Sequence, residues 1–211
     1  MKLLSENSPL IRFLSQLADF MMLNLIYLAF SIPLFTAGAS TAALYSVMIH
    51  RSNGNESPVL RLFWDSFRSC FAQATLTALI LLLPAALVCG DLYLLYIGAA
   101  GASTLLVWIC LIPAAIFPML LAYVFPLTAQ FDNSPGQTVK NALLLAIGNL
   151  PVTLAVTALN LSPVAILLIS REFFAKTLVW WLLVGFALVA WANEKLLHQV
   201  FKHFIPADEE K

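Results

Sequence analysis

Charged residues are scarce in this sequence, and their scarcity excludes an ordinary soluble domain. Only 10% of the 211 residues are charged and 61% are hydrophobic, whereas a soluble domain carries about 25% charged residues. The eleven basic and eleven acidic residues give a net charge of zero, so no overall field favours nucleic acid as a partner. The few charges also cluster in short connecting segments, which leaves five long uncharged stretches between them.

These uncharged stretches predict membrane-spanning helices, because four of them exceed the roughly 20 apolar residues that cross a bilayer as a helix. Their residues are apolar on every side, unlike the alternating pattern of a membrane β-strand. Lipid offers no hydrogen-bond partner to the backbone, so such segments must be helical. We expect an all-α, polytopic transmembrane helical bundle of five to six spans, forming a single domain over residues 1–211. The stretches are residues 20–50, 69–90, 92–131, 141–170 and 177–193.

The first uncharged stretch is too long for one span and carries a break. Pro33 removes a helical hydrogen bond, and Gly38 permits a turn. We therefore predict one helix over residues 9–31, a break at residues 33–38 and a shorter helix over residues 39–50. At 1.5 Å per residue the shorter helix is about 18 Å long, so it is either a tilted short span or a re-entrant half-helix.

The distribution of basic residues predicts the topology. If the first stretch crosses the membrane twice, nine of the eleven lysines and arginines lie on one side. Lysine and arginine collect on the cytoplasmic side, so this arrangement predicts that both termini are cytoplasmic. If the first stretch crosses the membrane only once, at most seven lysines and arginines lie on one side and four on the other. The remaining spans are expected at residues 70–90, 103–125, 141–169 and 177–193.

The segment before the second uncharged stretch has the pattern of an interfacial helix. Its aromatic residues recur at helical spacing on one face, opposite a charged face, so we predict an amphipathic helix that runs directly into the next span. Further along, Ser134 and Gln137 have the spacing of a capping box, which predicts a helix start. The apolar face comprises Leu60, Phe63, Trp64, Phe67 and Phe71, and the charged face Arg61, Asp65 and Arg68.

No catalytic motif is present: GxSxG, HExxH, the Walker loop and GxGxxG are all absent. The three cysteines show no CxxC spacing. Glu194 and His198 face together on the last helix, but His203 lies off that face, and two ligands are too few for a structural zinc site. We therefore expect no enzyme activity, including action on a lipid-linked substrate, and no metal or cofactor.

Polar side chains inside the predicted spans have two interpretations. They form packing hydrogen bonds between helices, or they line a solute pathway. Asp19, one turn inside the first helix, is similarly either an interfacial acid near Arg12 or a functional intramembrane acid. The candidate polar groups within the spans are Asn24, Gln73, Asn149 and Asn160.

Small residues follow one another at residues 36–43, and Ala39 and Ala43 have small-xxx-small spacing. Small residues let membrane helices approach closely, which predicts tight packing around the break. A broken helix also exposes a helix N-terminus, so a ligand site is the alternative. Irregular backbone at membrane depth needs cover, so we expect other spans to surround residues 33–45. The candidate packing or ligand residues are Asn24, Pro33, Gly38, Ala39, Ser40, Thr41, Ala43 and Tyr45.

Residues 24–33 and 36–45 together resemble the amino-terminal signature of the YesL family, also called DUF624. Residues 63–75, 123–133 and 140–151 resemble its later blocks. The resemblance implies a multi-pass protein of the bacterial cytoplasmic membrane. It also implies a frequent genomic association with carbohydrate uptake and degradation systems, especially sugar ABC transporters. The family has no established catalytic residues, so none is assigned to this chain.

Three functional hypotheses follow. The first is an accessory or regulatory partner of a sugar-uptake system, acting through helix contacts with a membrane protein such as a sugar ABC permease. The second is a small transporter or channel in its own right, working as a homo-oligomer. The third is a structural membrane protein unrelated to sugar. A conducting path separates them, because it requires polar groups from several spans around one cavity.

Overall fold

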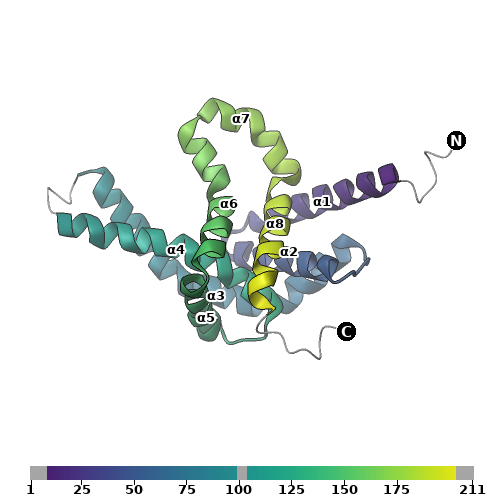
Figure 1. Cartoon of the computed structure of the whole chain (residues 1–211), viewed down its shortest axis with the longest axis horizontal. Helices are drawn as coiled ribbons and strands as arrows, with labels where there is room; N and C mark the ends of the chain where they lie inside the picture. Colours follow the sequence, from purple (N-terminus) through teal and green to yellow (C-terminus); the bar gives the residue numbers. More distant parts are fainter. Residues whose placement is uncertain (1–8, 99–103, 203–211) are drawn as a thin grey trace.

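The computed structural model describes residues 9–98 and 104–202, and the regular elements within them are all helical (Figure 1). Five helical stretches in this part of the chain are long and apolar enough to cross a membrane. The predicted transmembrane helical bundle is therefore confirmed. In chain order the elements are α1 (Pro9–Ser31), the 3₁₀ turn η2 (Leu34–Thr36), α2 (Ala37–Ser52), α3 (Val59–Tyr96), α4 (Thr104–Gln130), α5 (Pro135–Gly148), α6 (Leu150–Ile169), α7 (Arg171–Trp180), the π-helical turn η3 (Trp181–Gly185) and α8 (Phe186–Phe201).

The predicted break in the first hydrophobic segment is present between α1 and α2. A single 3₁₀ turn joins the two helices, and the side chain of Thr36 donates hydrogen bonds to the carbonyls of Phe30 and Pro33, at 2.6 and 2.8 Å. The ion pair between Asp19 and Arg51 joins the first part of α1 to the end of α2. The two helices therefore form an antiparallel hairpin.

Residues 32–35 face outward, which corrects that part of the expectation that other spans surround residues 33–45, whereas most residues from Thr36 to Tyr45 are buried. Ile32 and Leu34 are each 83% exposed and Phe35 is 63% exposed. The expectation failed because it assumed that the freed carbonyls need other helices as partners. Hydroxyl groups within the segment satisfy them instead, as serine and threonine can in membrane helices.

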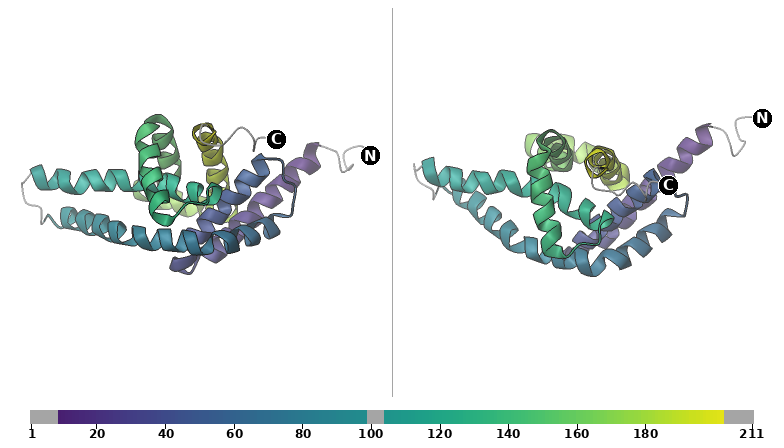
Figure 2. Two further views of the ribbon diagram at one scale, coloured as in Figure 1. Left: turned by 90° about the horizontal axis from the view of Figure 1, so that it is seen from below. Right: turned by 60° about the horizontal axis from the view of Figure 1, so that its bottom comes forward.

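Helix α2 occupies the centre of the molecule. It contacts α1, α3, α4 and α8, and ten of its sixteen residues are buried. The outer parts of α3 and α4, in contrast, do not lie at the centre. Figure 2 shows that they extend together as an arm away from the other helices. In Figure 1, α6, α7 and α8 form an arch on another side of this centre.

The amphipathic segment and the span that follows it form one continuous helix, α3, as predicted. Its 38 residues extend about 57 Å at 1.5 Å per residue, which exceeds the roughly 30 Å hydrocarbon core. On its predicted apolar face, Phe63 and Phe67 are buried, whereas Leu60 and Trp64 are 51% and 40% exposed. The ring of Phe30 in α1 contacts the rings of Phe63, Trp64 and Phe67, so α1 packs against this part of the face.

Helix α5 begins at the predicted capping box, where the backbone N–H of Gln137 donates to the Ser134 hydroxyl. The single span predicted at residues 141–169 is wrong, because the chain leaves the helical conformation at Asn149 and separates α5 from α6. Pro151 has no N–H to continue the helical ladder. The hydroxyl of Thr153 donates across the junction to the carbonyl of Ala146, at 2.8 Å.

Two further spans are longer than predicted. Helix α4 continues to Gln130, with Pro126 accommodated inside it. The final stretch runs from Arg171 to Phe201 without interruption. It begins where the Ser170 hydroxyl accepts a hydrogen bond from the Phe173 amide, a capping arrangement that the charge pattern did not reveal.

Candidate functional site

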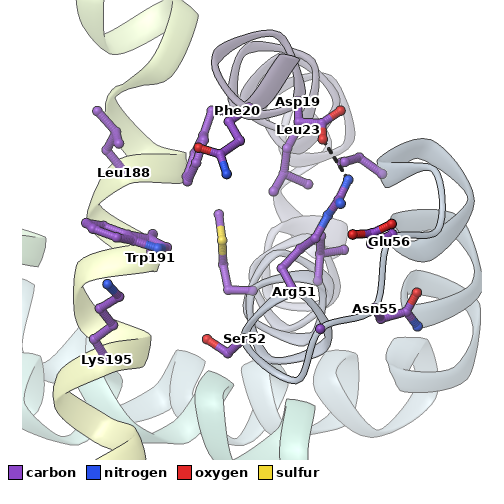
Figure 3. A pocket seen from close by; sticks show the side chains of 15 residues that line it. Asp19, Phe20, Leu23, Arg51, Ser52, Asn55, Glu56, Leu188, Trp191 and Lys195 are labelled. Carbon is purple, nitrogen blue, oxygen red and sulfur yellow. Dashed lines mark hydrogen bonds and ion pairs between the residues drawn. The ribbon is translucent and has the colours of Figure 1, made fainter. Parts of the chain in front are cut away.

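A groove of about 600 Å³ lies between α1, the end of α2, the connection from α2 to α3, and α8 (Figure 3). The volume falls within the range of small-molecule sites in proteins. Its walls come from segments that are far apart in the sequence. They meet because α1 pairs with both α2 and α8, so the groove is a product of the helix arrangement.

One end of the groove is polar. The Arg51 guanidinium and the Asp19 carboxylate form an ion pair at 2.7 Å, with about a third of each side chain exposed. Asn55 and Glu56, from the connection after α2, lie on the same side of the groove as this ion pair, and Lys195 faces them from the opposite wall, on α8. Asp19, interpreted from sequence as an interfacial acid near Arg12 or a functional intramembrane acid, is paired with Arg51, which the hairpin brings beside it.

The other end of the groove is apolar, with an aromatic pair between the two ends. Leu23 and Leu188 belong to the apolar wall, on α1 and α8. The Phe20 and Trp191 rings meet edge to face with centroids 6.4 Å apart. The Lys195 ammonium lies 4.0 Å from the centroid of the Trp191 ring, within cation–π range.

Asn24 holds α1 against the π-helical turn η3, next to the groove. It is fully buried, and its amide nitrogen donates to the carbonyls of Trp181 and Leu182 at 3.0 and 2.7 Å. Its amide oxygen accepts a hydrogen bond from the Ala187 N–H at 2.9 Å. A π-helical turn disrupts the regular i to i+4 bonding of a helix, and Asn24 supplies partners at this turn.

A second buried polar network joins α2 to α6 and α8. The Asn193 amide nitrogen donates to the Tyr45 hydroxyl at 3.0 Å and to the Asn160 amide oxygen at 2.7 Å. Next to Asn193 in the sequence, Glu194 is only 5% exposed and its carboxylate accepts a hydrogen bond from the Ser52 hydroxyl at 2.7 Å. These bonds fix the end of α2 against the last helix.

Comparison with known proteins identifies the family. A family model described as "Protein of unknown function, DUF624" matches residues 20–92. The protein YteU of Bacillus subtilis is 31% identical over 157 residues, which cover 72% of this chain and 70% of YteU. YesL of the same organism is 26% identical over 140 residues, covering 64% of this chain and 66% of YesL. The chain belongs to the YesL family, DUF624.

Both Bacillus relatives of this YesL-family chain are described as uncharacterized proteins. No solved structure matches it at a significant level. The matched residues 20–92 contain the end of α1, the break, all of α2 and most of α3. The family match therefore covers the central packing unit together with much of the wall of the groove.

The structure places the small residues of this YesL-family chain in the central helix. Gly38, Ala39, Ser40 and Ala43 are buried, and Tyr45 joins the network with Asn193. A Cβ atom added at Gly38 would lie 3.0 Å from the Ala78 side chain and 3.1 Å from the Ala74 carbonyl. These positions therefore bring α2 and α3 into close contact. Thr41 is partly buried and donates to the Ala37 carbonyl within its own helix, while Pro33 is exposed in the break.

The other intramembrane polar candidates also bond within the protein. The Gln73 amide donates to the Asn133 carbonyl at 2.7 Å and connects α3 to the segment before α5. Asn149 donates to the Leu145 carbonyl at 3.3 Å and closes the end of α5. These sites are separate from the Asn24 and Asn160 networks, so the four amides do not converge on one place.

The acid and histidine pair considered as a metal site is a contact within α8. The Glu194 carboxylate lies 3.9 Å from the His198 ring nitrogen, whereas His203 falls outside the residues that the structure describes. In residues 9–98 and 104–202, no group of three or more histidine, cysteine or acidic side chains is placed to hold a metal ion.

Sequence reasoning did not find the groove. Its residues come from α1, α2, the following connection and α8, and no local motif unites them. One signal was available. Asp19 lies one turn inside the first predicted span, seven residues after Arg12, and an acid in such a position requires a partner. Pairing it with Arg51 would have identified the polar end of the site.

Proposed function

We propose that this YesL-family chain is a membrane accessory or regulatory protein that acts without enzymatic chemistry, through helix contacts with the permease of a sugar ABC transporter. One observation carries the proposal: each of the four intramembrane amides is hydrogen-bonded within the chain itself. Polar side chains that bond between helices stabilise packing. A conducting path would require such groups around a shared cavity.

The positions of these amides favour an accessory role over a channel. Asn24 binds the η3 turn, Gln73 binds the segment before α5, and Asn160 binds Asn193 of α8. Asn149 bonds to a carbonyl of its own helix. Each amide therefore contributes to internal packing. The link to sugar uptake comes from the family resemblance, which associates these proteins with carbohydrate systems.

We also propose that the chain lies in the bacterial cytoplasmic membrane with both termini in the cytoplasm. Nine of the eleven basic residues are then cytoplasmic. The α1–α2 hairpin supports this topology, because the Asp19–Arg51 ion pair places the start and the end of the hairpin together. Single cysteines at positions 56 and 172, in a background without the native cysteines, test it with an impermeant thiol reagent. Position 56 should react only from inside and position 172 from outside, and the reverse pattern would contradict the topology.

Copurification and flux measurements test the functional proposal. The tagged chain, extracted in mild detergent, should recover the permease of a sugar ABC transporter above the level obtained with an unrelated tagged multi-pass protein. Deleting the chain should lower uptake through that transporter. Liposomes containing the purified chain alone should show no sugar flux. Flux that Gln73→Leu or Asn160→Leu abolishes would instead support the channel hypothesis.

A further inference from the structure

We propose that the groove between α1 and α8 binds a phospholipid whose headgroup carries both a phosphate and a primary ammonium, as phosphatidylethanolamine does. The inference concerns a ligand of this chain and does not depend on the proposed partner. It rests on the polarity of the groove along its length and on the charges at its polar end.

The groove changes from polar to apolar in the same direction on α1 and α2, and its α8 wall, which runs across these two helices in Figure 3, also has an apolar and a charged part. On α1, Asp19 is followed by Leu23. On α2, which runs antiparallel, Met48 precedes Arg51. On α8, Leu188 precedes Lys195. One end therefore matches a polar headgroup, and the other matches the first part of an acyl chain.

The charges at the polar end match a zwitterion. Asp19 and Arg51 neutralise each other at 2.7 Å. Across the part of the chain that the structure describes, Glu56 and Lys195 form no ion pair, although both line the groove. Lys195 is a partner for the phosphate and Glu56 for the ammonium, because charge-assisted hydrogen bonds are the stronger ones. A purely anionic headgroup has no ammonium to pair with Glu56, so its negative charge would repel the Glu56 carboxylate.

The aromatic residues favour a lipid over a free sugar. A sugar would require an open aromatic face, but the Lys195 ammonium occupies one face of Trp191, and Phe20 contacts the same ring. A free sugar also has no hydrocarbon chain to cover Leu23 and Leu188. A tryptophan beside a lysine is typical of the membrane interface, where headgroups lie.

Native mass spectrometry of the full chain in mild detergent tests the proposal. The probes are phosphatidylethanolamine and phosphatidylglycerol with identical acyl chains. We expect phosphatidylethanolamine to bind about tenfold more tightly, the effect of one charge-assisted hydrogen bond. Lys195→Gln should weaken both lipids about tenfold by the same reasoning. Glu56→Gln should reduce phosphatidylethanolamine to the level of phosphatidylglycerol.

Control variants separate a site from general lipid association. Lys140→Gln and Glu172→Gln remove exposed charges elsewhere and should leave both affinities unchanged. Leu188→Trp, which fills the apolar end, should abolish binding of both lipids. Thermal unfolding in the same detergent verifies that each variant is folded. Equal binding of the two lipids to the unaltered chain would overturn the proposal. Equal losses in the control variants would overturn it as well.

Discussion

Helix α2 and the arm formed by the outer parts of α3 and α4 are built from different side chains. The central helix is rich in alanine and serine, and its residues from Ala42 to Met48 are all buried. The arm is rich in leucine and isoleucine, and these remain exposed: Leu83 is 69%, Leu87 61% and Ile112 52% exposed. The more polar helix is therefore inside, and the more hydrophobic helices are outside.

This inversion shows what stabilises a helical membrane protein. Lipid chains are as apolar as leucine, so leucine gains little when it leaves lipid for the protein interior. Small residues allow backbones to approach closely, and hydroxyl and amide groups need partners that lipid lacks. The centre therefore collects serine and asparagine side chains, which would mostly lie on the surface of a soluble protein, beside small apolar residues. Substitutions in the two regions should have correspondingly different effects.

The largest expected effect is at the contact between α2 and α3. Gly38→Leu should lower the free energy of unfolding by about 3 kcal/mol, the upper end for overpacking a tight site. Even a single Cβ atom there would lie 3.0 Å from Ala78 and 3.1 Å from the Phe125 ring. Reversible unfolding of the purified protein in mixed detergent micelles measures the change.

Gly90→Leu is the matched control for that substitution, because Gly90 lies on α3 in the arm. A Cβ atom at Gly90 has no neighbouring atom within 4 Å, so this variant should unfold like the unaltered protein. Equal losses at the two glycines would contradict the distinction between a packed centre and a lipid-facing arm.

A smaller effect is expected at the contact between α1 and η3. Asn24→Leu keeps the side-chain volume but leaves two carbonyls and the Ala187 N–H without their partner. We expect a loss of about 2 kcal/mol, the cost of buried groups left unsatisfied. Asn141→Leu is the control, since no hydrogen bond of the Asn141 side chain occurs among the described residues. A neutral result for both variants would mean that Asn24 contributes nothing to packing.

Ser40 and Thr41 distinguish packing from ligand binding within α2. Ser40 is fully buried and donates to the Tyr27 carbonyl of α1 at 2.9 Å. Ser40→Ala should therefore cost about 0.6 kcal/mol, the average for a hydrogen bond between membrane helices. Thr41→Val should cost less, because Thr41 bonds within its own helix. Unchanged stability for both, with altered partner recovery, would favour the ligand interpretation of this segment.

The parts of the fold that sequence predicted correctly have local causes. The bounds of α1 and the break after it follow from Pro33 and from the length of the uncharged stretch. The start of α5 follows from the spacing of Ser134 and Gln137. These signals involve residues a few positions apart, so they are readable without knowing the packing.

The parts that sequence missed depend on long-range contacts. The break at Asn149 is an exception, because Pro151 is a local signal, but Pro126 lies inside α4 without breaking it, so proline alone did not mark the break. The partners of Asn24 and Asp19 lie on other helices, and only the assembled hairpin brings them together. The groove combines four segments, so its existence depends on helix pairing rather than on a motif.

The smallest expected effect is in the arm itself. Leu83→Ala should change the free energy of unfolding by less than about 0.5 kcal/mol, as surface substitutions usually do, because lipid or detergent replaces the lost contacts. Leu81, two positions earlier on the same helix, is only 4% exposed. Leu81→Ala should therefore cost about 2 kcal/mol, the lower end for a buried leucine. The two substitutions remove the same atoms from the same helix, so hydrophobicity and helix propensity cancel in the comparison. A loss at Leu83 as large as that at Leu81 would show that a further surface covers the arm in the folded protein.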